Sequence, residues 1–134
     1  MGSENMRAME AIIDAANRRD FDELLEHTAP DFEIDFSGSA SPDAKGMYRG
    51  HEEARGFLET IVAPWEEYDW FATEFIEEGD QIVRVGGFRA KAKAGGPEVT
   101  AHGAQLWGFR DGRAVSMRQF DHRDEALEAA GIAP

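Results

Sequence analysis

The feature that most constrains the fold is a strand-turn-strand pattern near the C-terminus, centred on Arg110-Asp111-Gly112. Segments with strand-like alternation flank this turn at residues 105–109 and 113–121, which is typical of two antiparallel strands with one buried face. A glycine at the third loop position suits a three-residue loop, because that position requires positive φ. This register pairs Phe109 with Arg113.

The register of the hairpin decides which side chains share a face of the sheet. A two-residue Asp-Gly loop is the alternative, and it places His102 opposite Asp121. We prefer the three-residue loop, because it gathers the large apolar side chains on one buried surface. The shared face then carries Gln105, Trp107 and Phe109 on one strand and Val115, Met117, Gln119 and Asp121 on the other. A carboxylate and two amides at the end of an apolar face indicate a pocket without naming its ligand.

Composition limits the classes of function that this chain can have. Its 134 residues, 42% of them hydrophobic, fit one domain, residues 1–134, with a buried core. The formal charge of −13 disfavours nucleic acids and anionic membrane surfaces as partners. The absence of cysteine excludes disulfides and thiolate chemistry. The first 20 residues lack the basic start and apolar core of a signal peptide and no apolar run reaches membrane-spanning length, so we expect a cytoplasmic protein.

The order of helical and strand patterns predicts the architecture. Apolar residues at helical spacing predict helices at about 4–18, from Asp20, at about 51–62, and at 126–130 before Gly131. Alternation predicts strands at 32–36, 69–76, 81–94, 98–109 and 113–121, with a bulge or bend at Gly86-Gly87. Helices grouped before strands indicate an α+β domain. We expect a curved antiparallel sheet wrapped by the N-terminal helices, a cone whose open end would bind a small ligand.

Four local signatures, in this order and spacing, carry a resemblance to a known family. They are Asp20-Phe21-Asp22-Glu23-Leu24, Ala29-Pro30-Asp31-Phe32, Tyr48-Arg49-Gly50-His51-Glu52 and the hairpin Phe109-Arg110-Asp111-Gly112-Arg113-Ala114-Val115. Over nearly the whole chain they resemble the nuclear transport factor 2-like superfamily, especially its SnoaL-like, polyketide cyclase-like branch. The resemblance implies a cone-shaped, cystatin-like α+β barrel. It also implies a homodimer formed through the outer sheet face, where Phe71, Phe75, Val83, Val85 and Leu106 could supply apolar contacts.

The catalytic sets of this superfamily match the chain only in part. At the positions where ketosteroid isomerases carry a tyrosine and two aspartates, this chain has Ile12, Phe36 and Gln105. Arg84 matches the arginine of the epoxide hydrolases, but the carboxylate positions of those enzymes fall at Gly86 and Gln119 and their first-strand pair falls at Ile34 and Phe36. For SnoaL-type cyclases, Asp121 approximately matches the acid/base aspartate. Their histidine position falls near Trp107, although His102 lies on the same strand.

Asp121 is therefore the candidate catalytic residue. Burial in an apolar mouth favours the protonated form of a carboxyl group and suits it to proton transfer. The competing interpretation is an N-cap, because Asp121 directly precedes the last predicted helix. The candidate ligand-binding residues are Ile34, Phe36, Tyr48, Arg84, Gln105, Trp107, Met117 and Gln119, with His102 and Trp65 as possible additions.

Each of these candidates also has a purely structural interpretation. Arg84 could form an ion pair, the two glutamines could bond to each other, and the aromatic residues could pack in the core. No spacing of histidine and acidic residues indicates a metal site, and we expect no cofactor. The leading hypothesis is a cofactor-independent acid/base enzyme of cyclase, isomerase or hydrolase type that acts on a small hydrophobic carbonyl- or hydroxyl-bearing molecule. The alternative is a non-catalytic small-molecule-binding or dimerisation module of the same fold.

Overall fold

The computed structural model describes residues 3–37 and 46–133 and has the expected α+β architecture. The helices are α1 (Glu4–Asn17), α2 (Phe21–Glu26), α3 (Gly50–Val62) and α4 (Arg123–Ala130), with a short 3-10 turn η1 (Lys93–Gly95). The strands are β1 (Thr28–Asp35), β2 (Met47–Arg49), β3 (Trp65–Glu78), β4 (Gln81–Ala92), β5 (Glu98–Arg110) and β6 (Arg113–Phe120).

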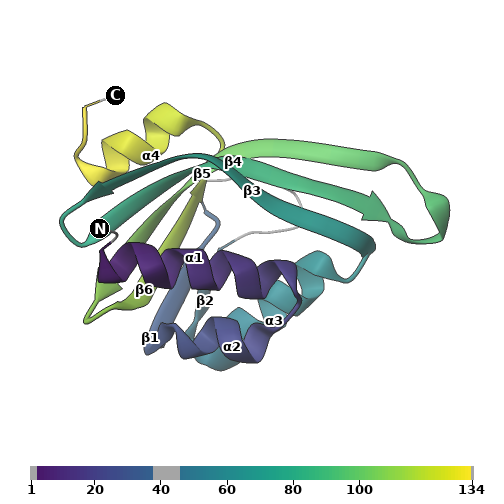
Figure 1. The fold of residues 1–134 in the computed structure, drawn as a ribbon, viewed down its shortest axis with the longest axis horizontal. Coiled ribbons are helices and arrows are strands. Elements are labelled where there is room, and N and C mark those ends of the chain that lie inside the picture. The colour runs from purple at the N-terminus through teal and green to yellow at the C-terminus, as the bar shows by residue number, and fades with distance from the viewer. Residues whose placement is uncertain (1–2, 38–45, 134) are drawn as a thin grey trace.

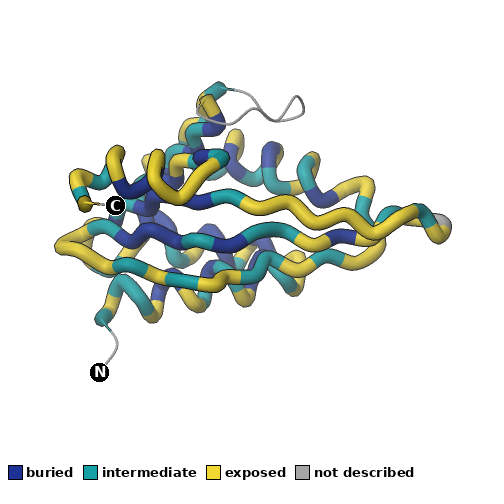
Figure 2. Tube along the Cα trace, turned by 90° about the horizontal axis from the view of Figure 1, so that it is seen from above, coloured by how far each residue is buried: buried dark blue, intermediate teal, exposed yellow. Residues whose placement is uncertain are grey.

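The six strands form one curved sheet in the order β2-β1-β6-β5-β4-β3. Neighbouring strands are antiparallel except β1 and β6, which run parallel. Helices α1, α2 and α3 cover one face of the sheet, and α4 lies on the opposite face (Figure 1). We call these the inner and the outer face. The first five residues of β5 are exposed and residues 104–107 are buried, so the far end of the long strands extends beyond the core (Figure 2).

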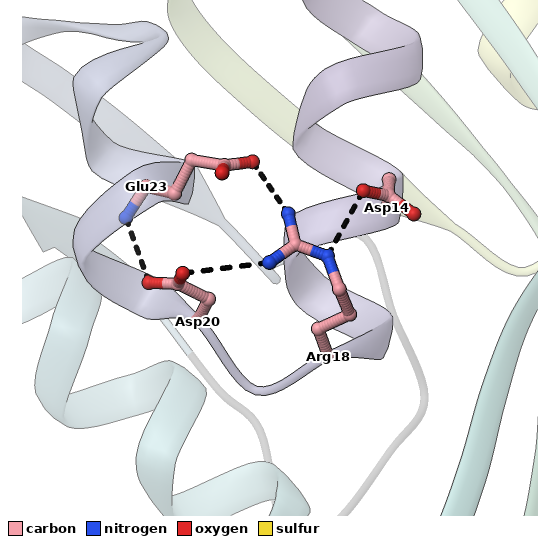
Figure 3. A network of polar contacts seen from close by, with 4 residues as sticks. All are labelled: Asp14, Arg18, Asp20 and Glu23. Atoms are coloured by element: carbon pink, nitrogen blue, oxygen red, sulfur yellow. Dashed lines mark hydrogen bonds and ion pairs between the residues drawn. The ribbon is translucent and has the colours of Figure 1, made fainter.

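The helix starts follow from capping side chains. Ser3 Oγ accepts a hydrogen bond from the amide of Met6 at 2.9 Å at the start of α1, and Asp20 Oδ1 accepts one from Glu23 at 3.1 Å at the start of α2. The start at Asp20 is thus confirmed. The carboxylate of Glu23 binds Arg18 at 2.6 Å, and Arg18 also contacts Asp14 at 3.0 Å and Asp20 at 3.4 Å (Figure 3). This exposed network joins the end of α1 to the beginning of α2.

Two hydrophobic clusters lie on the two faces of the sheet. The larger one packs α1, α2 and α3 against the inner face, with Met9, Ile12, Phe32 and Ile34 almost completely buried. The smaller one packs α4 against the outer face and contains Val83 and Leu106. The prediction that these two residues contribute to an exposed dimer face is therefore wrong, because α4 covers them. The homodimer itself stays a prediction.

The hairpin between β5 and β6 differs from the preferred register. Arg110 pairs with Arg113, so the loop has two residues, and φ is positive at both Asp111 (54°) and Gly112 (75°), as an Asp-Gly hairpin turn requires. The three-residue loop is therefore wrong. A register shift next to Gly108 then moves the pairing by one residue.

This shift restores the predicted shared face. Gly108 pairs with Ser116 whereas Phe109 pairs with Ala114, so Val115 is an extra residue on β6. Beyond the bulge, Trp107 lies opposite Met117 and Gln105 lies opposite Gln119. The sharing of one face by these four residues is confirmed, although the turn that was expected to produce it is not the one observed.

Candidate ligand-binding site

A cavity of about 1030 Å³ lies between α3 and the inner face of the sheet. Its size suits a small organic ligand. Its wall combines aromatic rings, backbone at glycine positions and a few polar side chains. The lining residues are Phe36, Tyr48, Glu53, Gly56, Phe57, Thr60, Ile61, Pro64, Trp65, Trp70, Arg84, Gly86, Gly87, Phe88, Ala101, His102, Gly103, Gln105, Gln119 and Asp121.

Three polar side chains form a row across the centre of the sheet. Arg84 on β4 lies opposite Gln105 on β5, and Gln105 lies opposite Gln119 on β6. Gln105 Nε2 donates to Gln119 Oε1 at 2.9 Å, so the expected bond between the two amides is confirmed. Gln105 Oε1 accepts from Arg84 Nη1 at 3.3 Å and from the indole nitrogen of Trp107 at 3.0 Å. We call these three residues the polar row.

Trp107 sets the polarity of this row. An indole N–H can only donate, so it requires the oxygen of the Gln105 amide on its side. The amide nitrogen of Gln105 must then point toward Gln119. Both lone pairs of Gln105 Oε1 are occupied, which leaves mainly N–H donors for a ligand at this position.

Arg84 is the buried charge of the site, with 3% of the residue exposed. Its Nη2 donates to the main-chain carbonyl of Phe71 at 2.7 Å, and its Nε has no hydrogen-bond partner among the described residues. Burial lowers the pKa of Arg84 to about 10, and the negative charge of Asp69 acts in the opposite direction. The guanidinium therefore stays charged at neutral pH.

Two glycines bring the backbone close to the polar row. Gly86 lies opposite Gly103, two residues along from Arg84 and Gln105 on their strands. A Cβ at Gly86 would lie 2.1 Å from the carbonyl oxygen of Phe71, and one at Gly103 would lie 2.8 Å from Gln119 Nε2. Both positions therefore exclude a side chain.

The bulge predicted at Gly86-Gly87 lies on the neighbouring strand. The β3–β4 register shifts between Ala72 and Glu74, so the extra residue is Thr73, opposite Gly86 and Val85. The Phe71 carbonyl that binds Arg84 lies just before this bulge. Close approach of β3 to Gly86 therefore depends on the missing side chain.

Aromatic rings line two parts of the cavity. Phe36 and Tyr48 each contact Phe57 of α3, with ring centroids 4.8 and 4.3 Å apart. Trp65 and Trp70 each contact Phe88 of β4, at 6.1 and 4.6 Å. The expected roles of Phe36, Tyr48 and Trp65 as wall residues agree with these positions.

Asp121 lines the cavity at the end of β6 and is not the N-cap of α4. The N-cap is His122, whose amide donates to Glu125 Oε1 at 3.1 Å. The interpretation of Asp121 as the N-cap is therefore wrong, because the N-cap is the next residue along the chain.

Three other predicted residues line a second cavity, whereas His102 lines the large one. Ile34, Trp107 and Met117 line a smaller cavity of about 50 Å³, which shares Arg84, Gln105 and Trp70 with the large one. His102 contributes to the wall, but its ring contacts Phe71 edge-on at 5.8 Å. The register that would place His102 opposite Asp121 is not formed, because Ala104 pairs with Phe120 and this register differs by one residue.

The sequence interpretation missed most of the contribution of α3, and it also missed Phe88 of β4. Glu53, Phe57, Thr60 and Ile61 follow one another at helical spacing on the side of α3 that faces the cavity. Phe57 and Ile61 have the apolar spacing of a core face, and nothing in the sequence distinguishes a wall from a core. Trp70 and Phe88 are directly paired across β3 and β4, a signal that becomes visible only once the register is known.

Neither a metal site nor a membrane-spanning helix is found in the described part of the chain. No three His, Cys, Asp or Glu side chains within residues 3–37 and 46–133 are grouped as a metal site requires. No helix in these ranges is long and apolar enough to span a membrane.

The family follows from the match of a family model, described as a SnoaL-like domain, to residues 9–117. The chain belongs to the SnoaL-like family. No curated protein matches its sequence. The fold is shared with solved nuclear transport factor 2-like and ketosteroid isomerase-like structures.

Three solved structures illustrate this similarity. A nuclear transport factor 2-like protein of unknown function from Burkholderia pseudomallei is 29% identical, with a TM-score of 0.78 over 95% of this chain and 97% of that one. TerC, co-crystallised with polyporic acid, is 25% identical, with a TM-score of 0.78 over 94% and 97% of the two chains. RV0760c from Mycobacterium tuberculosis, in complex with estradiol-17beta-hemisuccinate, is 19% identical, with a TM-score of 0.75 over 92% and 97%.

Proposed function

We propose that the cavity binds a small, mostly apolar molecule with a carbonyl or hydroxyl group, and that Asp121 moves a proton to or from it. The protein would then be a cofactor-independent acid/base enzyme of cyclase, isomerase or hydrolase type. The observation that carries this proposal is that one cavity contains the Asp121 carboxylate, the N–H donors of the polar row and apolar walls.

The proposed division of labour follows from the chemistry of these groups. A carboxylate can accept a proton next to a carbonyl, or return it in its acid form, without a metal or cofactor. The negative charge that develops on the ligand oxygen would be stabilised by fixed donors of Arg84, Gln105 and Gln119. Trp65, Trp70 and Phe88 would contact the apolar remainder of the molecule.

The solved relatives support the class of ligand. TerC was crystallised with polyporic acid and RV0760c with an estradiol derivative, and a computationally designed binder of 17-OHP has the same fold, with a TM-score of 0.75. A cavity of about 1030 Å³ in this chain has room for molecules of that size.

A non-catalytic binding module is the second candidate. It is favoured by the residues at the positions where ketosteroid isomerases carry functional groups. Ile12 is a core residue with 2% exposure, Phe36 is part of the cavity wall, and Gln105 is bound to its neighbours. Such a module would use the same cavity and the same donors, with Asp121 serving only as a polar contact.

A thermal-shift screen of hydrophobic ketones, lactones and steroids against the wild type and Asp121→Asn separates these functions, because a ligand of the folded state raises its melting temperature. For an enzyme, we expect the variant to bind a hit but to convert it about 10²–10⁴-fold more slowly. Asp124→Asn, in the exposed first turn of α4, is the matched control and should behave as the wild type.

Full turnover by Asp121→Asn would contradict the proton-transfer role. Binding without any conversion by the wild type would favour the binding module. No hit from any compound class would contradict both.

A further inference from the structure

We infer that the ligand of this cavity carries a carboxylate and that the guanidinium of Arg84 binds it. The inference rests on the proposed function, because it requires the cavity to be the ligand site. It goes further in assigning a permanent negative charge to the ligand and in naming the residue that selects it.

The first argument is the set of partners that Arg84 has in the protein. Its described acceptors, the amide oxygen of Gln105 and the carbonyl of Phe71, are both neutral. The carboxylate that acts on it electrostatically is Asp69, which is itself paired with Arg89 at 3.2 Å on the half-exposed rim. A buried charge is costly unless it is paired and hydrogen-bonded. A bound anion would supply the charged partner.

The second argument is the unused donor capacity of the guanidinium. Arg84 Nε has no acceptor among the described residues, although buried polar atoms are rarely left unpaired. A carboxylate can accept two parallel N–H bonds from an arginine, which suits it better than a single carbonyl oxygen. Small movement of the Arg84 side chain toward the large cavity, which it already lines, would bring these donors to the ligand.

The third argument is the polarity of the row. Gln105 Oε1 already accepts hydrogen bonds from both Arg84 and Trp107, so it has no free lone pair for a ligand hydroxyl or amine. Next to Arg84 and Gln105, the row therefore favours a ligand group that accepts hydrogen bonds. A carboxylate is such a group, and its charge also neutralises Arg84.

The experiment compares two probes that differ in charge but hardly in shape, 2-anthracenecarboxylate and 2-anthracenecarboxamide. Isothermal titration calorimetry on the wild type should give about tenfold tighter binding of the carboxylate, since a charge-assisted hydrogen bond is roughly twice as strong as a neutral one. Arg84→Met should remove this preference and leave the affinity for the amide within about threefold.

Arg89→Met is the matched control, because Arg89 lies on the same strand but pairs with Asp69 and covers the ring of Phe71. It should retain the preference for the carboxylate. If the wild type binds the two probes equally, or prefers the amide, the inference is overturned. This result needs only the wild-type protein, so it does not depend on whether a variant folds.

The outcomes also separate this inference from the proposed function. If neutral ketones or steroids stabilise the protein while the carboxylate does not bind, the inference fails and the ligand site stands. If neither the neutral compounds nor the carboxylate bind, both fail. A carboxylate preference that survives Arg84→Met would assign the anion to another group and overturn the role of Arg84.

Discussion

The side chain of Arg84 is withdrawn from water on folding, and the acceptors that it gains are an amide oxygen and a main-chain carbonyl. Neither acceptor carries a charge, so desolvation of the guanidinium is offset only in part. The same feature that makes Arg84 suitable for an anionic ligand thus acts against the stability of the ligand-free protein.

We therefore expect Arg84→Met to raise the free energy of unfolding of the ligand-free protein by about 1 kcal/mol at about pH 8, because methionine has a similar length and no charge to desolvate. Urea unfolding would measure this difference. A variant that is several kcal/mol less stable than the wild type would show that the guanidinium holds β3, β4 and β5 together.

The sign of the pH dependence follows from the pKa of Arg84, which burial lowers to about 10, below the value of an arginine in the unfolded chain. Between these values the unfolded chain binds more protons than the folded one, so the Arg84 contribution to stability rises with pH. Below about pH 10 the burial cost is fully present. The stability advantage of Arg84→Met should thus be constant from about pH 6 to 9 and shrink above about pH 10.

The sequence predicts which polar residues form the row, but it does not predict the hydrogen-bond partner of each one. The amide pair of Gln105 and Gln119 was one of two interpretations, and it is the one observed. An ion pair was an equal possibility for Arg84, yet its described acceptors are neutral. The choice depends on the position of the Phe71 carbonyl, which a bulge on another strand determines.

At the level of elements, the β5–β6 hairpin shows why strand identity is easier to predict than register. Asp-Gly indicates a turn, but two-residue and three-residue loops place opposite faces of the second strand inward. The bulge at Val115 reverses the faces once more. Gly108 accommodates it, because a Cβ there would lie 2.7 Å from Ser116 Oγ. Such a bulge depends on tertiary packing and has no local signature strong enough to place it.

The close approach of β3 to Gly86 can be tested by adding a side chain at this position. A Cβ there would lie 2.1 Å from the Phe71 carbonyl oxygen, so β3 must move, and this weakens the hydrogen bond that Arg84 donates to that carbonyl. We expect Gly86→Ala to lower the free energy of unfolding by about 1–3 kcal/mol, the cost typical of overpacking. Chemical denaturation of the variant and the wild type would measure it.

Gly56→Ala is the matched control for this substitution. Gly56 lies within α3, and a Cβ there would meet nothing within 4 Å. Alanine should therefore stabilise the protein by about 0.5–1 kcal/mol, because glycine is a poor helix former. If both variants were equally stable, the backbone approach at Gly86 would not be a constraint on the fold.

At the level of the whole molecule, the grouping of helices before strands was enough to predict the α+β class and the helices across one face. The position of α4 on the outer face was not predictable in the same way. Val83 and Leu106 look like exposed apolar positions until a helix packs over them. The parallel pairing of β1 with β6 was also missed, because it joins segments far apart in the sequence.

The net charge of the chain predicts how the affinity for an anionic ligand depends on salt concentration. A formal charge of −13 repels an anion as it approaches the protein, whereas the attraction of Arg84 acts at short range inside the cavity. Salt screens exposed charges strongly and buried pairs much less. Raising the salt concentration from about 20 mM to about 500 mM should therefore strengthen binding of 2-anthracenecarboxylate a few-fold and leave 2-anthracenecarboxamide unchanged. Calorimetry at the two concentrations would measure both affinities, and weaker binding of the carboxylate at high salt would place its partner on an exposed basic surface instead of in the cavity.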